Sequence, residues 1–340
     1  MDRFIVGTGR CGSTLLSRML AESPEMASLF EFINGLPGNR FAPSTMSGPD
    51  LWQIISQPHP FVTMVTSRGH RVEEITYPFG RPGVRFGAGD SLPWLLVSML
   101  PRLTDDPDRL FDESQAFVCA QPHRTPPDHY RTYFQWLAEQ TGRTMWNERS
   151  GGGIEYLPEL ARAFPGARFV HLHRAGEETS LSMREHAAFR LAISIIYGLD
   201  PEVDLATALA TLTPKAGEDD PVARMLARRP HAAHFGVFWS DQLVNGYRGV
   251  QVLDPAQYIE VSFDDMVDDP RTTLRRIAAH FAMDPDAGGW IERAAAMVRG
   301  RPPERAGELP APERERLAEV CRAGNRLLGR PVTPKIVLDA

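Results

Sequence analysis

The sequence predicts an α/β fold in which a central parallel sheet carries helices on both faces, with helical or irregular insertions. The first observation is a short apolar run, Arg3–Val6, which leads through a glycine loop into a helical pattern from Ser13. The second is the order helix, strand, helix over residues 154–190, whose short connections are typical of a parallel sheet. The third is size, because 340 residues, 42% of them hydrophobic, can bury one large core. We therefore expect a single domain over residues 1–340.

In the first half of the chain, predicted strands and helices flank a long irregular segment. Short apolar runs predict strands at Arg3–Val6, Met26–Phe32, Gln115–Ala120 and Thr144–Glu148. Helical patterns cover Ser13–Glu22 and Asp128–Thr141. Over about residues 33–115 the pattern weakens and Pro and Gly are frequent, which predicts an irregular, partly helical insertion.

The second half predicts two more strands, a second insertion and a helical end. The strands lie within Pro165–Arg174, after a turn, and Tyr258–Phe263. The helices are Ile154–Phe164, Glu177–Arg190, His231–Tyr247, Asp269–Met283, Gly288–Val298 and Ala311–Gly329. The second insertion, about residues 187–235, contains the loop-rich run Leu199–Arg224. We expect the two insertions to cap a cleft at the sheet on its acceptor side and to select the acceptor.

Composition excludes several kinds of partner. A net charge of −6 gives no overall basic field for nucleic acid. No run of 18 apolar residues exists, so no membrane span is expected. No charged and apolar leader precedes the first strand, and the three cysteines fit neither a disulfide framework nor a metal pair. We therefore expect a cytoplasmic protein.

The loop after the first strand carries two overlapping phosphate-binding patterns. Gly7, Gly9 and Gly12 spell G-x-G-x-x-G, as in dinucleotide-binding loops. The same stretch spells G-x-x-x-x-G-S-T, in which Ser13 stands where a nucleotide-triphosphate loop has lysine. In both patterns, backbone N–H groups at the start of a helix form a nest for an anion. The residues predicted to bind that anion are Gly9, Arg10, Cys11, Gly12, Ser13, Thr14 and Leu15.

Two enzyme classes use such a loop. A P-loop nucleotide kinase needs a lysine at the position of Ser13 to contact the β- and γ-phosphates. A Rossmann-type oxidoreductase needs an acidic residue that binds the ribose, and Glu31 follows Gly12 at about the required distance. Against this second class, Arg10 between the glycines is unnecessary for a pyrophosphate that backbone amides already hold. Both classes remain alternatives.

A second anion site is indicated near the middle of the chain. Arg174 leaves a predicted strand, and Ser182 follows eight residues later in a predicted helix. An arginine and a serine that face one another can bind a phosphate group. The sequence therefore predicts a ligand with two separated anionic groups.

Three motifs, taken in order, resemble those of sulfotransferases that use 3′-phosphoadenosine-5′-phosphosulfate (PAPS). They are GTGRCGSTLL from residue 7, FPGARFVHLHRAGEETSLS from residue 164 and VSFDDMVDDPRTTLRRIAAHF from residue 261. The first motif and its continuation to Phe32 are most similar to the tyrosylprotein-type and bacterial branches of that family. The resemblance implies a P-loop-like parallel sheet.

The resemblance also implies how the donor binds. The first loop would hold the 5′-phosphosulfate, and Arg174 with Ser182 would hold the 3′-phosphate. A basic loop that the family places over the 3′-phosphate is matched by Arg299, Gly300 and Arg301. The implied cofactor is PAPS, its product is adenosine 3′,5′-bisphosphate (PAP), and no metal is required.

Four residues are candidates for a catalytic role. Glu31 stands where the tyrosylprotein branch carries a glutamate after the second strand, which implies a general base. His186 is the rival base, since other branches use histidine. Arg149 aligns with a family lysine that helps to neutralise the sulfate, and Arg10 supplies a cation near the bridging oxygen.

The expected function is in-line transfer of a sulfuryl group to a hydroxyl or amine. The acceptor is expected to be a small molecule or carrier-bound, and its identity stays open. A protein that keeps the nucleotide site but performs no chemistry is the remaining alternative.

Overall fold

The computed structural model describes residues 1–38, 40–211 and 219–330. Within the second predicted insertion, residues 212–218 lie outside the described residues, as do residues 331–340 of the predicted domain.

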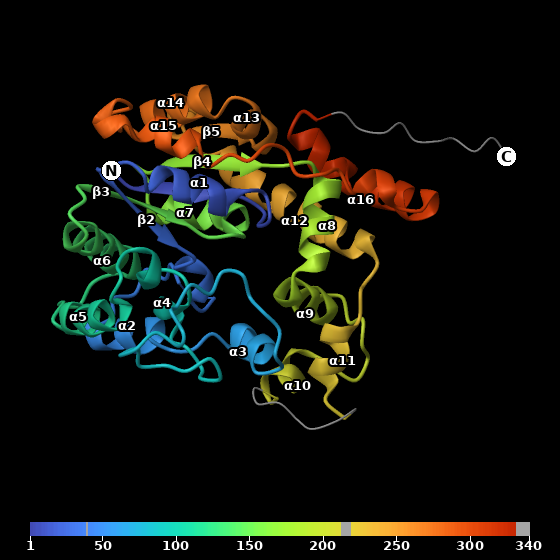
Figure 1. The fold of residues 1–340 in the computed structure, drawn as a ribbon, viewed down its shortest axis with the longest axis horizontal. Coiled ribbons are helices and arrows are strands. Elements are labelled where there is room, and N and C mark those ends of the chain that lie inside the picture. The colour runs from blue at the N-terminus through green and yellow to red at the C-terminus, as the bar shows by residue number, and fades with distance from the viewer. Residues whose placement is uncertain (39, 212–218, 331–340) are drawn as a thin grey trace.

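Five parallel strands form one central sheet, in the order β2-β3-β1-β4-β5 (Figure 1). The strands are β1 (Arg3–Val6), β2 (Met26–Phe30), β3 (Met145–Arg149), β4 (Arg168–His173) and β5 (Tyr258–Ser262). The predicted α/β fold with a parallel sheet is confirmed. Since β3 separates β1 from β2, the order differs from the 3-2-1-4-5 order of dinucleotide-binding Rossmann halves.

Both faces of the sheet are covered by helices because side chains alternate along its strands. In β1, Phe4 and Val6 join one hydrophobic core and Ile5 joins another. The helices on the Ile5 side are α1 (Ser13–Leu20), α13 (Phe263–Asp268), α14 (Pro270–Phe281) and α15 (Trp290–Ala295). Those on the Phe4 side are α6 (Pro126–Gln140), α7 (Leu157–Ala163) and α12 (Ala232–Val250).

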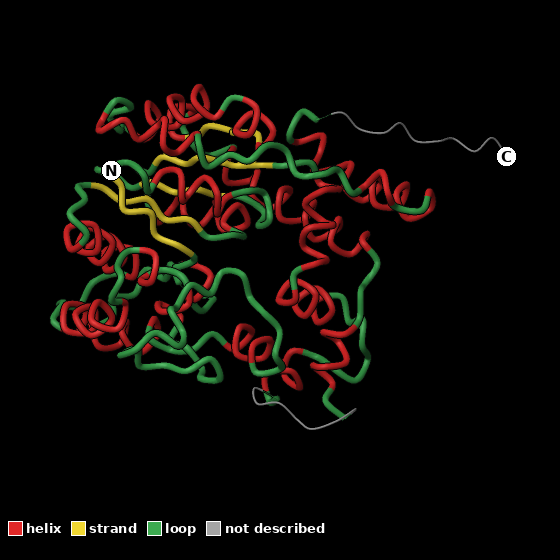
Figure 2. The backbone as a smooth tube through the Cα atoms, viewed as in Figure 1, coloured by secondary structure: helices red, strands yellow, loops and turns green. Residues whose placement is uncertain are grey.

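The remaining helices lie in the insertions and at the far end of the chain. The first insertion holds α2 (Gly48–Ile55), α3 (Pro60–Thr66), α4 (Trp94–Val97) and the start of α5 (Pro107–Cys119). After β4 come α8 (Gly176–Glu185), α9 (Ala187–Ile196), α10 (Leu205–Leu209) and α11 (Pro221–Ala227), and α16 (Ala311–Leu327) is the last described helix. Figure 2 shows the strands in the upper half of the view, above short helices and loops. The two insertions meet where α3 packs on α9.

Two predicted elements were wrong. The run Gln115–Ala120 is not a strand, because it falls at the end of α5, whose buried residues Leu110, Ser114 and Val118 recur at helical spacing. The predicted helix Glu177–Arg190 is interrupted at His186, whose φ of −93° and ψ of 119° are extended. The short helix α13 was not predicted from the sequence. None of the described helices combines the length and the apolar character needed to cross a bilayer.

Candidate active site

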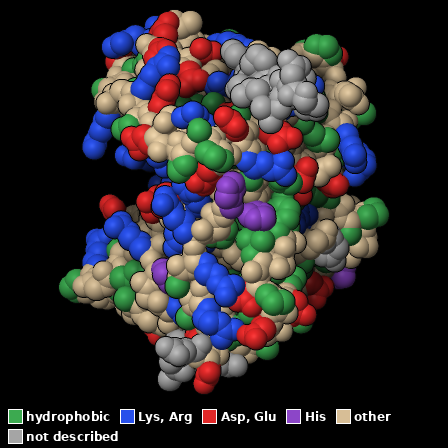
Figure 3. Space-filling view, turned by 90° about the vertical axis from the view of Figure 1, so that its right-hand side faces the viewer, with side chains coloured by type: hydrophobic (Ala, Val, Ile, Leu, Met, Phe, Trp, Pro, Cys, Tyr) green, Lys and Arg blue, Asp and Glu red, His purple; other side chains and the backbone are tan. Residues whose placement is uncertain are grey.

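A cleft of about 640 Å³ lies at the carboxyl ends of the strands. The glycine loop follows β1, Glu31 follows β2, Arg149 ends β3 and Arg174 follows β4, and residues from all four places line the cleft. This is where ligands bind in open parallel sheets. Figure 3 shows the surface hollowed between the upper and lower parts of the molecule, with basic side chains gathered there.

Left-handed backbone conformations, which glycine adopts at little cost, define the shape of the glycine loop. Gly9, Arg10 and Gly12 have φ values of 75°, 52° and 96°. A Cβ atom at Gly12 would lie 2.3 Å from the Phe263 ring, so that residue has no room for a side chain. Among the described residues no side chain caps the start of α1, which leaves its first backbone N–H groups available to an anion.

The side chain of Arg10 connects the loop to two other parts of the chain. Its Nε donates to Ser182 Oγ of α8 at 3.2 Å, and its two terminal nitrogens pair with Glu74 and Glu73 at 3.3 Å each. The two predicted anion sites, around Arg10 and around Ser182, therefore adjoin within one cleft.

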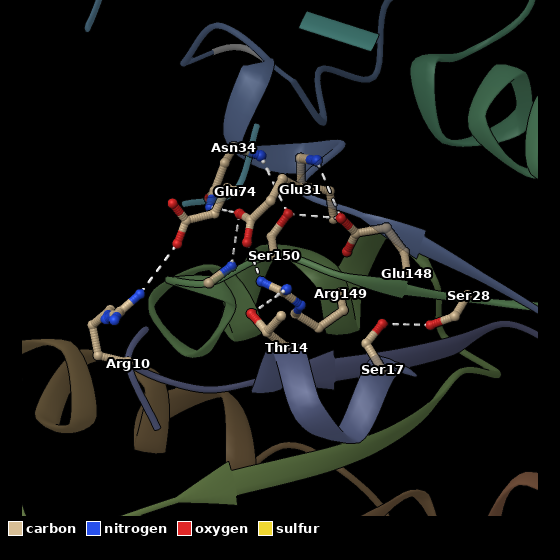
Figure 4. A network of polar contacts seen from close by, with 12 residues as sticks. Arg10, Thr14, Ser17, Ser28, Glu31, Asn34, Glu74, Glu148, Arg149 and Ser150 are labelled. Atoms are coloured by element: carbon tan, nitrogen blue, oxygen red, sulfur yellow. Dashed lines mark hydrogen bonds and ion pairs between the residues drawn. The ribbon is translucent and has the colours of Figure 1, made fainter. Parts of the chain in front are cut away.

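Glu31 and Arg149 form a buried ion pair at the base of the cleft (Figure 4). Arg149 Nη1 donates to Glu31 Oε1, and Arg149 Nη2 donates to Thr14 Oγ1 at 2.9 Å. Oε2 of Glu31 accepts from Gly151 N at 3.0 Å and from the amide of Asn34. The Arg149 side chain is 2% exposed and that of Glu31 is 9% exposed, so water screens this pair weakly.

The backbone of Glu31 is held in an unusual conformation. Its φ is 57°, in the left-handed region that a non-glycine residue rarely adopts. The Glu31 N–H donates to the Arg149 carbonyl at 2.7 Å, and its carbonyl accepts from Trp94 Nε1 at 2.7 Å. A Cβ at Gly35 would lie 2.0 Å from the Trp94 ring, so the indole fits only because Gly35 lacks a side chain.

A second carboxylate, Glu148, lies buried behind this pair. Burial raises its pKa to about 8, so the acid is largely protonated at neutral pH. Glu148 Oε1 accepts from Ser150 Oγ at 2.6 Å and from Ile33 N at 3.3 Å. Ser150 Oγ accepts in turn from Asn34 N at 3.3 Å, and this links the acid to the segment that follows Glu31.

His186 is held by the first insertion. Its Nε2 lies 2.9 Å from Glu74 Oε2. Burial would raise the pKa of Glu74, but the hydrogen bond and charge of His186, with the charge of Arg10, lower it to about 2. His186 Nδ1 is buried with no hydrogen-bond partner among the described residues. The break between α8 and α9 thus places His186 beside the loop arginine.

Arg174 and Ser182 both line the cleft. The Arg174 guanidinium lies 4.9 Å from the centre of the Phe263 ring, and Nη2 is 3.8 Å from Glu178 Oε2. Burial lowers the pKa of Arg174, with the nearby charges as smaller contributions. Its charge is only loosely compensated, because 3.8 Å is too long for a hydrogen bond.

Most of the predicted site residues gather in the cleft. Those that line it are Gly9, Arg10, Gly12, Ser13, Thr14, Leu15, Glu31, Arg149, Arg174, Ser182 and His186. Cys11 is fully buried and points away from the cleft lining, beside Gly7. Arg299, Gly300 and Arg301 are not among the lining residues, and Arg301 Nε instead donates to Asp268 Oδ1 at 2.7 Å.

Two arginines that line the cleft, Arg18 and Arg102, were not predicted from the sequence as site residues. Arg18 lies one turn after Thr14 on α1, and its i+4 spacing could have revealed it. Arg102 comes from the first insertion, where no pattern pointed to it. Burial and the charges of Arg149 and Arg18 lower the pKa of Arg102 to about 10. Its Nε is buried with no hydrogen-bond partner among the described residues, so positive charge here exceeds what the chain compensates.

Other cleft residues were missed as well, and they belong to segments without a readable pattern. Among them are Asn34, Glu73 and Glu74. In the part of the chain that the structure describes, no group of three or more His, Cys, Asp or Glu residues could hold a metal ion.

Comparison with known proteins gives similarity of structure only. No family profile and no curated protein matches the sequence. Among solved structures, the chain is similar to the sulfotransferase domain of the Synechococcus PCC 7002 olefin synthase, with 16% identity and a TM-score of 0.47 over 95% of this chain and 94% of that one. It is similar to the sulfotransferase domain of the curacin biosynthetic pathway, with 13% identity and a TM-score of 0.45 over 98% of both chains. It is also similar to the sulfotransferase STF9 from Mycobacterium avium, with 15% identity and a TM-score of 0.47 over 97% of this chain and 77% of that one.

Proposed function

We propose that this chain transfers a sulfuryl group from PAPS to a hydroxyl or amine acceptor. The observation that carries the proposal is the buried pair of Glu31 and Arg149 at the carboxyl ends of β2 and β3, in one cleft with the glycine loop. A carboxylate that can take a proton and a guanidinium that can stabilise anionic oxygens then lie in contact.

The residues present fit a donor with two anionic ends. The backbone N–H groups that begin α1 would hold the 5′-phosphosulfate, and Arg174 with Ser182 would hold the 3′-phosphate. The contact of Arg10 with Ser182 supports a single ligand, because it joins both anion sites in one cleft. The cleft of about 640 Å³ falls within the usual range, roughly 300–1,000 Å³, of small-molecule sites.

The chemistry follows from the groups around the base. PAPS supplies the sulfuryl group and a phosphate leaving group. Glu31 accepts the proton of the acceptor hydroxyl as the new S–O bond forms and the old one breaks, and later releases that proton to water. Arg149 is forked between Glu31 and Thr14, so it can stabilise the oxygens of the transferred group while it orients the base.

We propose Glu31, rather than His186, as the general base. The Nε2 atom of His186 is engaged by Glu74, and its Nδ1 atom is buried. His186 therefore lacks an open nitrogen toward an acceptor. We propose that His186 positions Glu74 and, through it, Arg10.

The two alternative enzyme classes are less well supported. The strand order separates β1 from β2, unlike in Rossmann dinucleotide domains, and Glu31 is engaged by Arg149 rather than free for a ribose. A nucleotide kinase would lack the phosphate-binding lysine, because Ser13 stands in its place.

The test is transfer of labelled sulfate from PAPS to a panel of acceptors, together with the affinity for PAP measured by calorimetry. Glu31→Gln is expected to reduce transfer at least 100-fold with little change in PAP affinity, since general-base catalysis contributes about 10²–10⁴-fold. The control is Glu315→Gln, at an exposed position of α16. A protein that binds NAD or ATP but not PAP would contradict the proposal, and unchanged transfer by Glu31→Gln would exclude Glu31 as the base.

A further inference from the structure

The cleft has two chemically different ends. One end is formed by the glycine loop and the arginines described above. The other end, which we term the apolar compartment, is formed by side chains of the two insertions. Its residues are Phe61, Val62, Val72, Trp94, Val97, Ala188, Phe189 and Ala192. An apolar wall with few polar groups is what orients a small molecule with an apolar body.

The apolar compartment adjoins the proposed base and the proposed donor loop. Trp94 contacts Glu31 directly, through the hydrogen bond from its indole Nε1 to the Glu31 carbonyl. Phe189 packs over the glycine loop, since a Cβ at Gly9 would lie 2.9 Å from Phe189 Cζ. A molecule that filled the compartment would therefore have one end beside Glu31.

The apolar compartment is stabilised by contact between the two insertions. Phe61 and Val72 of the first insertion belong to one hydrophobic cluster with Ala188 and Leu191 of α9. Val72 is 6% exposed, so its side chain is part of the packed wall rather than of an open surface. Both insertions are thus needed to form this end of the cleft.

The charges at its margin argue against an ionic acceptor. Glu73 and Glu74 line the cleft there, and both are already paired with Arg10, with His186 as a further partner of Glu74. A cationic acceptor would have to replace these partners. An anionic group at this margin would meet the acidic pair, which costs free energy by like-charge repulsion. Arg102, the arginine that the first insertion contributes to the cleft, lies instead close to Arg149 and Arg18.

A polar side chain, His59, lies beside the apolar compartment. His59 lines the cleft, and its ring centre lies 4.7 Å from that of Trp94. Its Nδ1 atom is buried with no hydrogen-bond partner among the described residues. Burial lowers the pKa of His59, so the imidazole is neutral at neutral pH. This site can satisfy one polar group of a bound molecule, but it cannot satisfy the many hydroxyls of a sugar.

We propose that the acceptor is an uncharged alcohol or phenol whose apolar body lies among Phe61, Trp94 and Phe189, with its hydroxyl directed at Glu31. This inference rests on the proposed function and specifies its substrate class. The apolar compartment excludes water from the body, and the contact of Trp94 with Glu31 fixes the distance between body and base.

The experiment compares four acceptors at equal concentration with labelled PAPS: 2-naphthol, 4-hydroxybenzoate, tyramine and glucose. We expect kcat/KM for the neutral 2-naphthol to exceed that of each of the other three at least tenfold. Preference for a charged acceptor or for glucose would overturn the inference, as would transfer to none of the four by a protein that binds PAP. Failure of the wild-type protein to bind PAP would instead overturn the proposed function.

Two variants test whether the acceptor lies in the apolar compartment. Val72→Asp places a charge in the wall, and Phe61→Ala removes a ring at a partly exposed position that folding tolerates better. Each is expected to lower kcat/KM for 2-naphthol at least tenfold while the affinity for PAP, which also reports folding, changes less than twofold. The matched control is Val244→Asp, whose parent residue is 40% exposed on α12. If Phe61→Ala keeps wild-type kcat/KM for 2-naphthol, the acceptor does not lie in the apolar compartment.

Discussion

Trp94 Nε1 donates a hydrogen bond of 2.7 Å to the backbone carbonyl of Glu31, although the two residues are 63 positions apart. The indole belongs to the first insertion, and the carbonyl belongs to the residue that follows β2. Glu31 has a left-handed backbone conformation, which costs free energy and persists only where neighbours hold it. The insertion therefore does more than cover the cleft, because it fixes the direction of the proposed base.

Replacement of Trp94 tests this positioning. Trp94→Phe removes the donor and keeps a ring, so we expect kcat to fall about 5–10-fold, as for loss of a hydrogen bond worth roughly 1 kcal/mol. The affinity for PAP should stay unchanged, since Trp94 is not among the proposed donor contacts. Steady-state kinetics with calorimetry measure both, with Trp136→Phe on α6 as the control. A rise in KM for PAPS at constant kcat would contradict a role in positioning the base.

The forked contact of Arg149 should not survive a change to lysine. Arg149 binds Glu31 and Thr14 at once, which a single ammonium on a flexible stem cannot reproduce. We expect Arg149→Lys to lower kcat about 100-fold or more, in the range seen when one donor to a developing anionic oxygen is lost. Initial rates of sulfate transfer check this, with Arg162→Lys as the control because that side chain is 73% exposed. Equal rates for Arg149→Lys and wild type would remove Arg149 from the mechanism.

The buried acid Glu148 should make stability depend on pH. Its pKa in the folded chain is about 8, above the ordinary 4.5 of the unfolded chain, so the folded state binds more protons between these values. The contribution of Glu148 to the free energy of unfolding is therefore highest below pH 4.5. It falls as the pH rises from 4.5 through 8, by at most about 1.4 kcal/mol per pH unit.

Glu148→Gln is expected to abolish this slope, because the amide stays neutral and can still hydrogen-bond to Ser150. Urea unfolding between pH 5 and 9 measures the slope for both proteins. Glu139→Gln, at an exposed position of α6, should keep the wild-type slope. The same slope in Glu148→Gln and wild type would mean that Glu148 is charged in the folded chain at neutral pH.

Glu74 should compete with the donor for Arg10. Glu74→Gln removes the negative charge that holds both Arg10 and His186, so more positive charge remains for an anionic ligand. We expect the Kd for PAP to fall about 3–10-fold at low salt, with a smaller effect for Glu73→Gln because the Glu73 side chain is 67% exposed and screened by water. Calorimetry at two salt concentrations measures this. Weaker PAP binding by Glu74→Gln would instead assign Glu74 to the support of the loop.

Local sequence patterns predicted the elements that position the cleft. The apolar runs predicted all five strands of the sheet near their observed bounds. Glycines in the left-handed region mark the loop, because local sterics decide where such residues are tolerated. The run Gln115–Ala120 failed because a short apolar stretch has no period long enough to distinguish a strand from the end of a helix.

The sequence by itself determined the α/β order, the glycine loop after β1, and the positions of Glu31, Arg149 and Arg174 at the ends of three strands. Each of these depends on residues close together in the chain, where periodicity and turn chemistry act. Only the tertiary structure decided that Arg149 holds Glu31 across 118 positions, that Glu74 joins Arg10 to His186, and that Trp94 holds the backbone carbonyl of Glu31. The first contact depends on the pairing of β2 with β3, and the other two depend on how the first insertion packs over the cleft. Packing between distant segments leaves no periodic trace in the sequence.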